Sequence, residues 1–338
     1  MKKNLAVIGV GAVGVEILRI LKQRKFPVGS LRVFARSQRD IEIDGQKYKV
    51  EAVDKEGFDG IDIALFAGTE GEKGASVLYA NKFIEKGAVV IDNGNDFRLR
   101  KDVPLVIPEV NRQAALSHKG LIANPNCTTI QAVTALGGIH KKFGLKSFML
   151  TSFQATSGAG KKAAESLWNE TKALVEKNKN RGFDALDKIL DEKPECFDEQ
   201  IAFNIIPQIG GFTEEGYTSE EWKVVYESRK ILDNPDIKIS ATCIRVPVFT
   251  SHSESIYFTP SKKVSLVELE QALNSSEGVV YLKDSLCFPL QVEGKDPVFV
   301  CRLRKALDSE NSFWLWCVSD NLRKGAALNA VQIAQCLL

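Results

Sequence analysis

Short apolar runs alternate with amphipathic helical patterns from the N-terminus to about residue 125. We expect buried strands at apolar runs that span residues 5–8, 31–35, 61–67, 88–91 and, more weakly, 103–107. Between the first two runs, Val13, Ile17 and Leu21 recur at the spacing of one helix face. Strands that alternate with helices in this way predict βαβ units and a parallel sheet covered on both faces.

Strand-like segments in the second half of the chain are longer and alternate more regularly between apolar and polar residues. They span residues 147–154, 237–248, 255–259, 298–304 and 313–318. This period of two predicts a mostly antiparallel sheet with helices on one face. We expect two domains, residues 1–127 and 128–321, and a C-terminal helix at 322–338 that packs back on the first domain.

Composition and charge narrow the class of protein. The chain has 338 residues, enough for about two domains of ordinary size. Its 45 basic and 43 acidic residues give a net charge of +2, which argues against a nucleic-acid partner or a membrane surface. We expect neither a membrane span nor a signal peptide. The 7 cysteines lack metal-binding spacing, which predicts reduced thiols, a cytoplasmic location and no metal site.

A glycine-rich motif follows the first predicted strand and precedes the first predicted helix. It reads Gly9-Val10-Gly11-Ala12-Val13-Gly14. The glycines of such a motif permit a tight turn, a close approach to a pyrophosphate and close packing of helix on strand, while the helix N-terminus holds the anion. The position of the motif favours dinucleotide binding, and an ordinary glycine-rich turn is the alternative.

The end of the second predicted strand bears on which dinucleotide is bound. An NAD site usually places an acidic residue there, where it binds the ribose 2′-hydroxyl. This chain instead continues with Arg36, Ser37 and Arg39 and offers no acid. Two arginines suit a 2′-phosphate, so the sequence favours NADP over NAD. A solvated basic loop is the alternative interpretation.

Cys127 is the candidate nucleophile. It lies in Asn-Pro-Asn-Cys-Thr-Thr at residues 124–129, directly before apolar residues at helical spacing, so we expect it at or near a helix start. Unpaired N–H groups and the helix dipole would stabilise a thiolate there. The alternative is a small buried hydrophobe. We interpret these other cysteines in that way: Cys196, Cys287, Cys301, Cys317 and Cys336.

Other polar residues of the second half are candidates for the same site. His252 lies in a polar turn before a predicted strand and is the best acid/base candidate among the 3 histidines. Arg245 ends an apolar strand face, which indicates either a buried salt bridge or a clamp for a carboxylate. Thr218 begins a capping box that places Glu220 and Lys223 on one helix face, and their spacing alone favours a surface ion pair.

Several segments together resemble the aspartate-β-semialdehyde dehydrogenase family, nearly end to end and in order. They are NPNCTT at 124–129, FQATSGAG at 153–160, IAFN at 201–204, RVPV at 245–248, HSE at 252–254 and SDNLRKGAA at 319–327. The resemblance implies an α/β chain with an N-terminal Rossmann domain that binds NADP. It also implies a second α+β domain, similar to that of glyceraldehyde-3-phosphate dehydrogenase, for catalysis and dimerisation, and a homodimer or tetramer.

The resemblance further implies a reaction and the roles of individual residues. L-aspartyl-4-phosphate would be reduced by NADPH to L-aspartate 4-semialdehyde with release of phosphate, a step that leads to lysine, methionine, threonine and isoleucine. Cys127 would attack the acyl phosphate and form a thioester. His252 would be the acid/base, and Gln154 would orient the reacting groups.

Binding roles are implied as well. Phosphate would be held by Arg98, Asn126 and Lys223, the substrate's ammonium by Glu220 and its carboxylate by Arg245. The cofactor would be held by Gly9, Gly11, Ala12, Val13, Gly14, Arg36, Ser37, Arg39, Ser157, Gly158 and Asn321.

Two segments differ from the family's usual pattern. The glycine loop is one residue shorter than the family's Gly-x-x-Gly-x-x-Gly. The loop before Arg98 reads Asn93-Gly94-Asn95 in place of Asn-Thr-Ser, and Asp96 follows it, which places a carboxylate near the expected phosphate site. The alternatives are N-acetyl-γ-glutamyl-phosphate reductase, whose substrate has no free ammonium for Glu220, and a non-enzymatic paralogue on the same fold.

Overall fold

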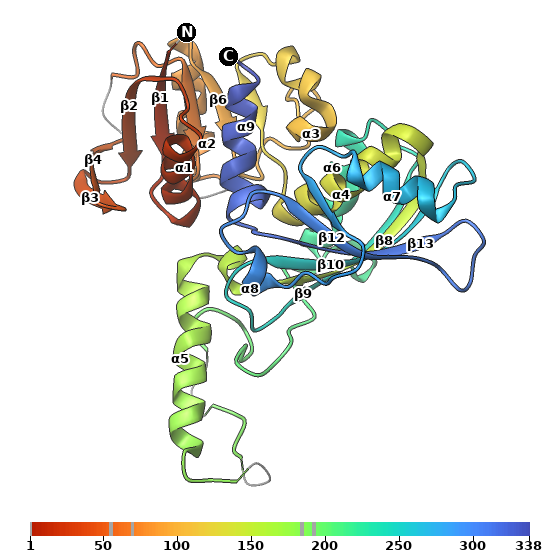
Figure 1. Cartoon of the computed structure of the whole chain (residues 1–338). Coiled ribbons are helices and arrows are strands. Elements are labelled where there is room, and N and C mark those ends of the chain that lie inside the picture. The colour runs from red at the N-terminus through yellow and green to blue at the C-terminus, as the bar shows by residue number, and fades with distance from the viewer. Residues whose placement is uncertain (1, 54–56, 69–70, 183–185, 191–193) are drawn as a thin grey trace.

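Two β-sheets organise the chain (Figure 1). The computed structural model describes residues 2–53, 57–68, 71–182, 186–190 and 194–338. Within these residues the first sheet has seven strands in the order β3-β4-β2-β1-β5-β6-β7. The second sheet has six strands in the order β11-β12-β13-β10-β8-β9.

The first sheet is parallel apart from the antiparallel pair β3 and β4. Its strands are β1 (Lys3–Ile8), β2 (Val28–Ala35), β3 (Arg39–Ile43), β4 (Gln46–Ala52), β5 (Ile63–Phe66), β6 (Val89–Asp92) and β7 (Leu121–Ala123). Helices cover both faces of this sheet. Alternate side chains of β1 therefore enter two different cores. Ala6 and Ile8 join the core of α2 (Ala75–Glu85), whereas Leu5 and Val7 join that of α1 (Ala12–Gln23).

The glycine-rich turn between β1 and α1 has room for no side chain at two positions. Gly9 has a φ of +103°, and a Cβ on it would lie 2.5 Å from the carbonyl oxygen of Ala67. A Cβ on Gly14 would lie 2.0 Å from the carbonyl oxygen of Gly9. Gly11, which precedes the first helical residue, has nothing within 4 Å on that side. The turn is therefore closed toward the protein and open where a ligand would approach.

The second sheet is mixed, with its antiparallel pairs at the centre. Its strands are β8 (Leu145–Gln154), β9 (Lys238–Arg245), β10 (His252–Pro260), β11 (Val279–Leu282), β12 (Val298–Lys305) and β13 (Phe313–Ser319). The β8–β9 and β11–β12 pairs are parallel, and the others are antiparallel. Three helices lie on one face: α4 (Cys127–Phe143), α6 (Ser219–Ile231) and α7 (Leu266–Asn274) (Figure 1). The sheet is mostly antiparallel, as expected, and only its two outermost pairs are parallel.

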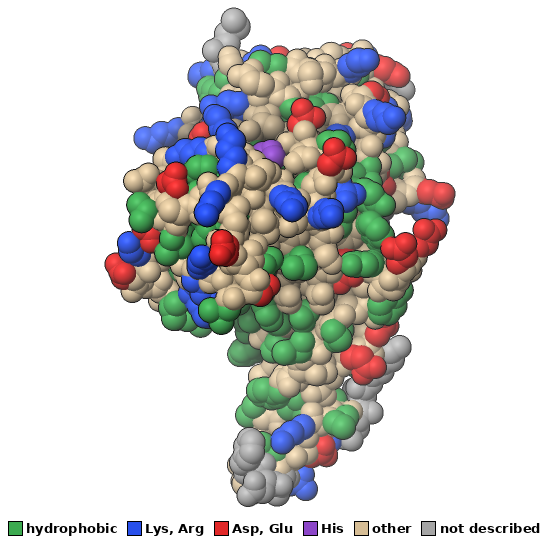
Figure 2. Space-filling view, turned by 90° about the vertical axis from the view of Figure 1, so that its right-hand side faces the viewer, with side chains coloured by type: hydrophobic (Ala, Val, Ile, Leu, Met, Phe, Trp, Pro, Cys, Tyr) green, Lys and Arg blue, Asp and Glu red, His purple; other side chains and the backbone are tan. Residues whose placement is uncertain are grey.

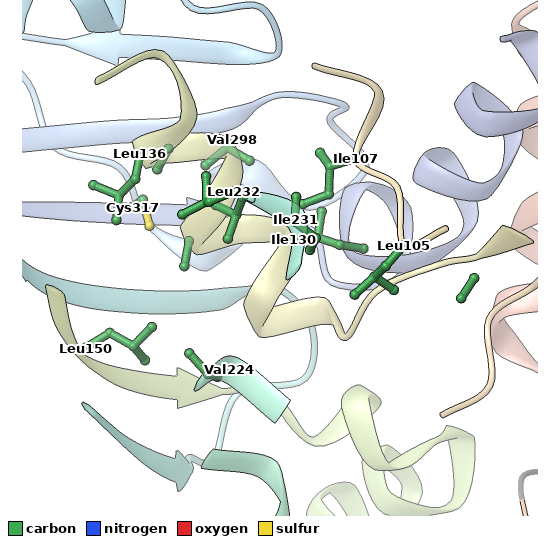
Figure 3. Close-up of a cluster of buried hydrophobic side chains, with 14 of the residues drawn as sticks. Leu105, Ile107, Ile130, Leu136, Leu150, Val224, Ile231, Leu232, Val298 and Cys317 are labelled. Carbon is green, nitrogen blue, oxygen red and sulfur yellow. The ribbon is translucent and has the colours of Figure 1, made fainter. Parts of the chain in front are cut away.

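A continuous core runs from the first sheet into the second. α4 leaves the first sheet directly after β7, and its residues Ile130 and Leu136 are fully buried. In Figure 3 they lie in one cluster with Leu105 and Ile107 of the first half and with Ile231 of α6. Burial of an aliphatic side chain contributes about 1.5–3 kcal/mol, so this cluster holds α4 firmly against both sheets.

The C-terminal segment returns to the first sheet. A π-helical turn, η5 (Arg323–Ala327), leads into α9 (Leu328–Gln335), and α9 shares its apolar core with α1. Lys324 within the π turn is buried, and its Nζ lies 2.6 Å from Glu109 Oε2 and 2.9 Å from Asn329 Oδ1. π turns are rare and concentrate at functional sites. This turn therefore marks the residues beside it as candidates for a functional site.

One helix projects from the body of the molecule. α5 (Lys161–Asn178) forms the arm at the bottom of Figure 1, and Figure 2 shows hydrophobic side chains around the base of this arm. Trp168, Phe203 and Phe249 are exposed in this part of the chain. No helix among the described residues has the length and apolar character needed to cross a bilayer. The remaining short helices are α3 (Pro108–Asn111), η1 (Arg112–Ser117), η2 (Thr156–Ala159), η4 (Glu214–Gly216) and α8 (Pro289–Val292).

Several strand predictions need correction. The segment 103–107 is not a strand, because only Leu105 forms a bridge, with Ala123. The predicted strand 237–248 ends at Arg245, and the one predicted at 255 already begins at His252. The edge strands β3, β7 and β11 and the strand β4 next to β3 were not predicted. In β3 and β4 charged residues alternate with apolar ones, so their apolar signal is weak.

Candidate active site

A cavity of about 350 Å³ opens between the two sheets. Its walls are the glycine turn after β1, the loop that follows β6, the start of α4, the end of β8, the first turn of α6 and the π turn. The carboxyl ends of parallel strands meet at such a crevice, where open α/β sheets usually bind their ligands. The cavity is therefore lined on one side by the glycine-rich turn and on the other by polar groups from the second sheet and its helices.

Cys127 is the first residue of α4, as the sequence predicted. Asn126 caps the helix, because its side-chain oxygen accepts hydrogen bonds from the N–H groups of Thr128 and Thr129 at 3.0 and 3.3 Å. Gly325 of the π turn packs directly on the cysteine, since a Cβ on it would lie 2.9 Å from the Cβ of Cys127. The thiol is half-buried and lies at the cavity wall.

The helix start does not by itself produce a thiolate. Burial and the nearby Glu220 carboxylate raise the pKa of Cys127 to about 11, and the cations Arg245, Arg98 and Lys223 only partly offset this. The expectation of a stabilised thiolate is thus wrong for the free protein, because desolvation disfavours the charged form.

His252 faces Cys127 from the first position of β10. Its Nε2 lies 3.4 Å from Cys127 Sγ, and its Nδ1 accepts the backbone N–H of Ala155 at 3.0 Å. The residue is fully buried and belongs to a strand rather than to the expected polar turn. Ser251 before it has a φ of +75°, and its N–H donates to Asn321 Oδ1 at 2.8 Å. This strained residue aims the imidazole at the thiol.

Arg245 ends β9 beside the histidine. Its Nη1 donates to the carbonyl oxygen of Ala155 at 2.7 Å, and no carboxylate among the described residues lies within ion-pair distance of it. Gly158 leaves the space over both groups open, since a Cβ there would lie 3.0 Å from Arg245 Nη1 and 3.2 Å from His252 Nε2. Within the described part of the chain, the buried salt bridge considered from the sequence is not found.

Glu220 lies opposite Arg245, at the second position of α6. Its Oε1 accepts the Asn126 amide at 2.8 Å, and its Oε2 accepts Lys223 Nζ at 3.2 Å. Burial opposes ionisation, but Lys223 and the Asn126 amide outweigh it, so the pKa of Glu220 lies below its ordinary value. Gln154 donates to Thr128 Oγ1 at 2.7 Å and approaches Glu220 Oε1 at 3.5 Å. The pair that spacing placed on the surface is part of the cavity wall.

Arg98 is held at the site by Glu227, a residue that the sequence analysis did not single out. Its Nη1 donates to Glu227 Oε1 at 3.1 Å, and its Nε and Nη2 donate to the carbonyl oxygens of Asn124 and Asn93. Glu227 is 1% exposed, and its Oε2 accepts the N–H of Asn126 at 2.6 Å. The signal for Glu227 was its spacing of seven residues from Glu220 on the same helix, which places both on one face.

The Asp96 carboxylate is bonded to a neighbouring turn. Its carboxylate accepts the N–H of Gly71 at 3.0 and 3.3 Å, across the loop, and so ties two turns together. The carboxylate that the sequence placed near the phosphate position is therefore used elsewhere. Asn93 takes the inner position, with its side chain bonded to Phe66 O and Asn124 Nδ2.

A second, larger cleft continues from the glycine turn. It has a volume of about 980 Å³, and its lining includes Gly9, Gly11, Arg36, Ser37 and Arg39. The open face of Gly11 and the uncapped N–H groups at the start of α1 suit a pyrophosphate. Lys73 and Lys162 line the same cleft. The residues present therefore fit a dinucleotide that carries an additional phosphate.

The turn after β8 lines the same cavity as Cys127. Ser157 Oγ donates to Asn321 Oδ1 at 3.2 Å, and Gly158 lies next to it on the cavity wall. Ala12 and Val13 line the same cavity. Most candidate residues thus line two adjoining spaces, with Arg36, Ser37 and Arg39 in the outer one. Gly14 and His252 line neither space: Gly14 packs on Gly9, and His252 lies behind Cys127.

The remaining cysteines differ in environment. Cys287, Cys301 and Cys317 are buried as expected, but Cys196 is exposed and Cys336 is only half-buried. Both lie outside the packed sheet centres, so a buried apolar role is wrong for Cys196. The described residues contain no group of three or more histidine, cysteine or acidic side chains arranged to bind a metal.

Comparisons with known proteins agree with this geometry. A family model described as the NAD binding domain of semialdehyde dehydrogenase matches residues 4–118, and one described as the semialdehyde dehydrogenase dimerisation domain matches residues 136–324. The chain is 44% identical to the aspartate-semialdehyde dehydrogenase of Aquifex aeolicus, over 100% of this chain and 98% of the relative. It is 41% identical to that of Bacillus subtilis, over 99% and 97%.

A solved structure also matches over nearly the whole length of both chains. The crystal structure of aspartate semialdehyde dehydrogenase II from Vibrio cholerae has a TM-score of 0.92 and 36% identity, over 100% of this chain and 98% of that chain. A second structure of that enzyme is described as a complex with ASA. The two family models, the full-length relatives and the solved structure agree, and the chain belongs to the aspartate-semialdehyde dehydrogenase family.

Proposed function

We propose that this chain catalyses the NADPH-dependent reduction of L-aspartyl-4-phosphate to L-aspartate 4-semialdehyde with release of phosphate. The observation that carries the proposal is that Cys127 Sγ, at the wall of the cavity, lies 3.4 Å from His252 Nε2. Arg245, which has no carboxylate partner among the described residues, and the acid Glu220 line the same cavity. The names of the relatives favour this activity over the N-acetylated sibling reaction, whose substrate has no ammonium for Glu220.

The charges of the cavity are complementary to this substrate. Aspartyl phosphate carries an ammonium, a carboxylate and a phosphate. Arg245 would bind the carboxylate through its planar fork, and Glu220 would bind the ammonium. Arg98 and Lys223, together with the Asn126 amide, would bind the phosphate on the other side of Cys127. The carbonyl carbon of the substrate then comes to lie over Sγ.

The chain's own residues would carry the covalent step. Sγ of Cys127 forms a bond with the acyl carbon, and phosphate leaves, which yields a thioester. The bound nicotinamide cofactor supplies the hydride that reduces this thioester. His252 would hydrogen-bond the sulfur and the reacting oxygen, and Gln154, fixed by Thr128, would orient the acyl group. Collapse of the reduced adduct releases the aldehyde and the thiolate.

The cofactor would lie along the outer cleft. Gly9, Gly11 and Gly14 shape the turn for the pyrophosphate, and Ser157, Gly158 and Asn321 would approach the nicotinamide end. Arg36, Ser37 and Arg39 would hold the 2′-phosphate of NADP. The shorter glycine loop still leaves the side of Gly11 open, so it suits the same pyrophosphate position.

We also propose that the chain is a homodimer assembled through the open face of its second sheet, and that it works in the cytoplasm. Met149, Tyr257 and Trp314 form one row across β8, β10 and β13 on that face, and Trp316 forms part of the next. Met149 is 51% exposed. Light scattering of the purified chain would give a monomer mass if this is wrong.

The assay of the proposed function is phosphate-dependent reduction of NADP with L-aspartate semialdehyde. Cys127→Ser should lose at least about a thousandfold in turnover, because a serine alkoxide is a much poorer nucleophile and leaving group than a thiolate. NADP binding should remain, since the cofactor cleft is untouched. A wild-type chain with no activity on this substrate would contradict the function, and an active Cys127→Ser would contradict the thioester.

The preference for NADP over NAD should depend on contacts with the 2′-phosphate. We expect a higher kcat/KM with NADP than with NAD, and a smaller difference in the double variant Arg36→Ala/Arg39→Ala. Each lost charged hydrogen bond costs roughly 1.5–3 kcal/mol, or about ten- to a hundredfold. Lys47→Ala, an exposed change in the same domain, is the control. An unaltered NADP/NAD ratio in the double variant would show that the two arginines are only surface charges.

Substitutions at the carboxylate-binding Arg245 and at the phosphate-binding Lys223 should have different kinetic effects. Arg245→Lys keeps the charge but loses the planar fork, so kcat/KM for aspartate semialdehyde should fall by about a hundred- to a thousandfold. The KM for inorganic phosphate should stay near normal in this variant and rise in Lys223→Ala. Equal weakening of phosphate and semialdehyde by Arg245→Lys would mean that the two clamps are assigned wrongly.

A further inference from the structure

Lys324 is a buried cation that no step of the proposed reaction uses. Its side chain is 1% exposed, and its Nζ donates to Glu109 Oε2 at 2.6 Å, to Asn329 Oδ1 at 2.9 Å and to Gln332 Oε1 at 2.9 Å. An ammonium has three protons and no lone pair, so these three oxygens occupy all of its donors. A buried ion pair is also weak evidence for stability, because well-packed apolar residues often serve as well. The cation therefore points to a role in orienting its neighbours.

The ammonium fixes the orientation of the buried amide of Asn329. Because Nζ can only donate, the amide oxygen must face it and the NH2 group must face away from it. That NH2 group donates to the carbonyl oxygen of Val106 at 2.9 Å and to Asn124 Oδ1 at 2.7 Å. A flipped amide would place its protons against the ammonium and its oxygen against two other oxygens. Lys324 thus allows only one orientation of Asn329.

This orientation is passed on to the amides of Asn124 and Asn93. Asn124 Oδ1 accepts from Asn329, so its NH2 group must point elsewhere. It donates to Asn93 Oδ1 at 2.9 Å and to the carbonyl oxygen of Ala326 at 3.3 Å. Asn93 Nδ2 in turn donates to the carbonyl oxygen of Phe66 at 2.7 Å. The chain of amides begins at a group that can only donate and ends at one that can only accept, so one direction satisfies every partner.

This chain of amides holds two walls of the cavity. The bond from Asn124 to the carbonyl oxygen of Ala326 ties the π turn to the segment before α4. Gly325, the neighbour of Ala326, packs on Cys127, where an added Cβ would lie 2.9 Å from the Cβ of the cysteine. The backbone carbonyl of Asn124 also accepts Arg98 Nε at 2.9 Å. A turned Asn124 side chain would therefore disturb the backing of the nucleophile.

We propose, resting on the function proposed above, that Asn329 is a positioning residue for the covalent step at Cys127, and that the ammonium of Lys324 sets its amide in the orientation this requires. Neither residue lines the cavity, so both act through others. Asn329 orients Asn124, and Asn124 holds the π turn against Cys127. The nucleophile is thus in place before any substrate binds, which is the kind of support from behind that a precise site needs.

Asn329 and Gln332 offer a matched pair of substitutions. Both amides accept Lys324 Nζ at 2.9 Å, but the NH2 group of Gln332 donates to Glu109 Oε1 rather than toward the cavity. Asn329→Asp and Gln332→Glu each keep the acceptor, remove the NH2 group and add one negative charge beside the same ammonium. Lys324→Met is less informative, because it leaves Glu109 buried without its cation and destabilises the whole fold.

Asn329→Asp should reverse the side chain of Asn124. A carboxylate beside Lys324 is ionised and cannot donate, so the NH2 group of Asn124 turns toward it. The oxygen of Asn124 then meets the carbonyl oxygen of Ala326, and the π turn is released. We expect kcat with aspartate semialdehyde, phosphate and NADP to fall by roughly ten- to a hundredfold, the scale that a misplacement of about 1 Å produces.

The kinetic constants separate this role from a merely structural one. The KM for NADP should stay within about threefold of wild type in Asn329→Asp, and Gln332→Glu should stay within about threefold of wild type in both kcat and KM. Lost stability alone would lower the amount of folded enzyme and leave the kcat of the folded fraction unchanged. A wild-type kcat in folded Asn329→Asp, or equal losses of kcat in the two variants, would overturn the proposal.

Alkylation of Cys127 by iodoacetamide tests the positioning without turnover. Gly325 covers the Cβ of Cys127, so release of the π turn should expose the thiol. The rate, followed by the mass of the peptide that contains Cys127, should rise by about fivefold or more in Asn329→Asp and stay unchanged in Gln332→Glu. The exposed Cys196 is the internal reference.

The alkylation rates also separate this proposal from the proposed function. An unchanged rate at Cys127 in Asn329→Asp would overturn the positioning role. A wild type that is inactive on aspartate semialdehyde, with alkylation rates that differ as expected, would instead refute the proposed function and leave the hold of Asn329 on the π turn standing.

Discussion

The buried carboxylate of Glu227 connects the two halves of the site, and the geometry around Cys127 depends on it. One oxygen accepts Arg98 Nη1, from the loop after β6 in the first sheet. The other accepts the N–H of Asn126, the residue that caps α4 and precedes the nucleophile. Because both oxygens are used as acceptors, only a carboxylate satisfies both partners. A buried charge of this kind is tolerated only when it is paired and fully hydrogen-bonded.

The face of α6 extends this arrangement in both directions. Lys223, one turn before Glu227, and Glu220, two turns before it, line the cavity. One turn after Glu227, Lys230 donates to three carbonyl oxygens of the Arg98 loop. One helix thus sets the loop, the phosphate-side cation and the acid opposite Arg245. Such preorganisation is what a site needs for a substrate with three charges, because the ion-pairing groups are already desolvated and oriented before binding. Burial first, and then the acid that suits the ammonium, raise the pKa of Cys127.

The sequence predicted the parts of this structure whose signals are local. The glycine turn, the helix start at Cys127 and the capping box at Thr218 each depend on a few adjacent residues, and each is found as predicted. The strands with long apolar runs were found for the same reason. The short edge strands and the mixed order of the second sheet were missed, because pairing between distant strands leaves no trace in either strand alone.

Non-local electrostatics was the other part that the sequence could not supply. Glu227 looked like one more charge on an amphipathic helix until the structure showed Arg98 beside it, 129 positions away in the chain. The same holds for Asp96, whose carboxylate meets Gly71 instead of the phosphate position. His252 Nδ1 likewise accepts the backbone N–H of Ala155, a group with no side-chain signature at all.

The most direct test of this account is the phosphate KM of Glu227→Gln, measured with aspartate semialdehyde and NADP. Glutamine keeps the shape but offers one acceptor and one NH2 group, so either Arg98 or the Asn126 N–H faces a donor. An unsatisfied buried donor costs about 1–3 kcal/mol. The account predicts that the phosphate KM rises by roughly ten- to a hundredfold, that the NADP KM stays unchanged, and that the exposed control Glu310→Gln behaves as wild type. A wild-type phosphate KM in a correctly folded Glu227→Gln would contradict it.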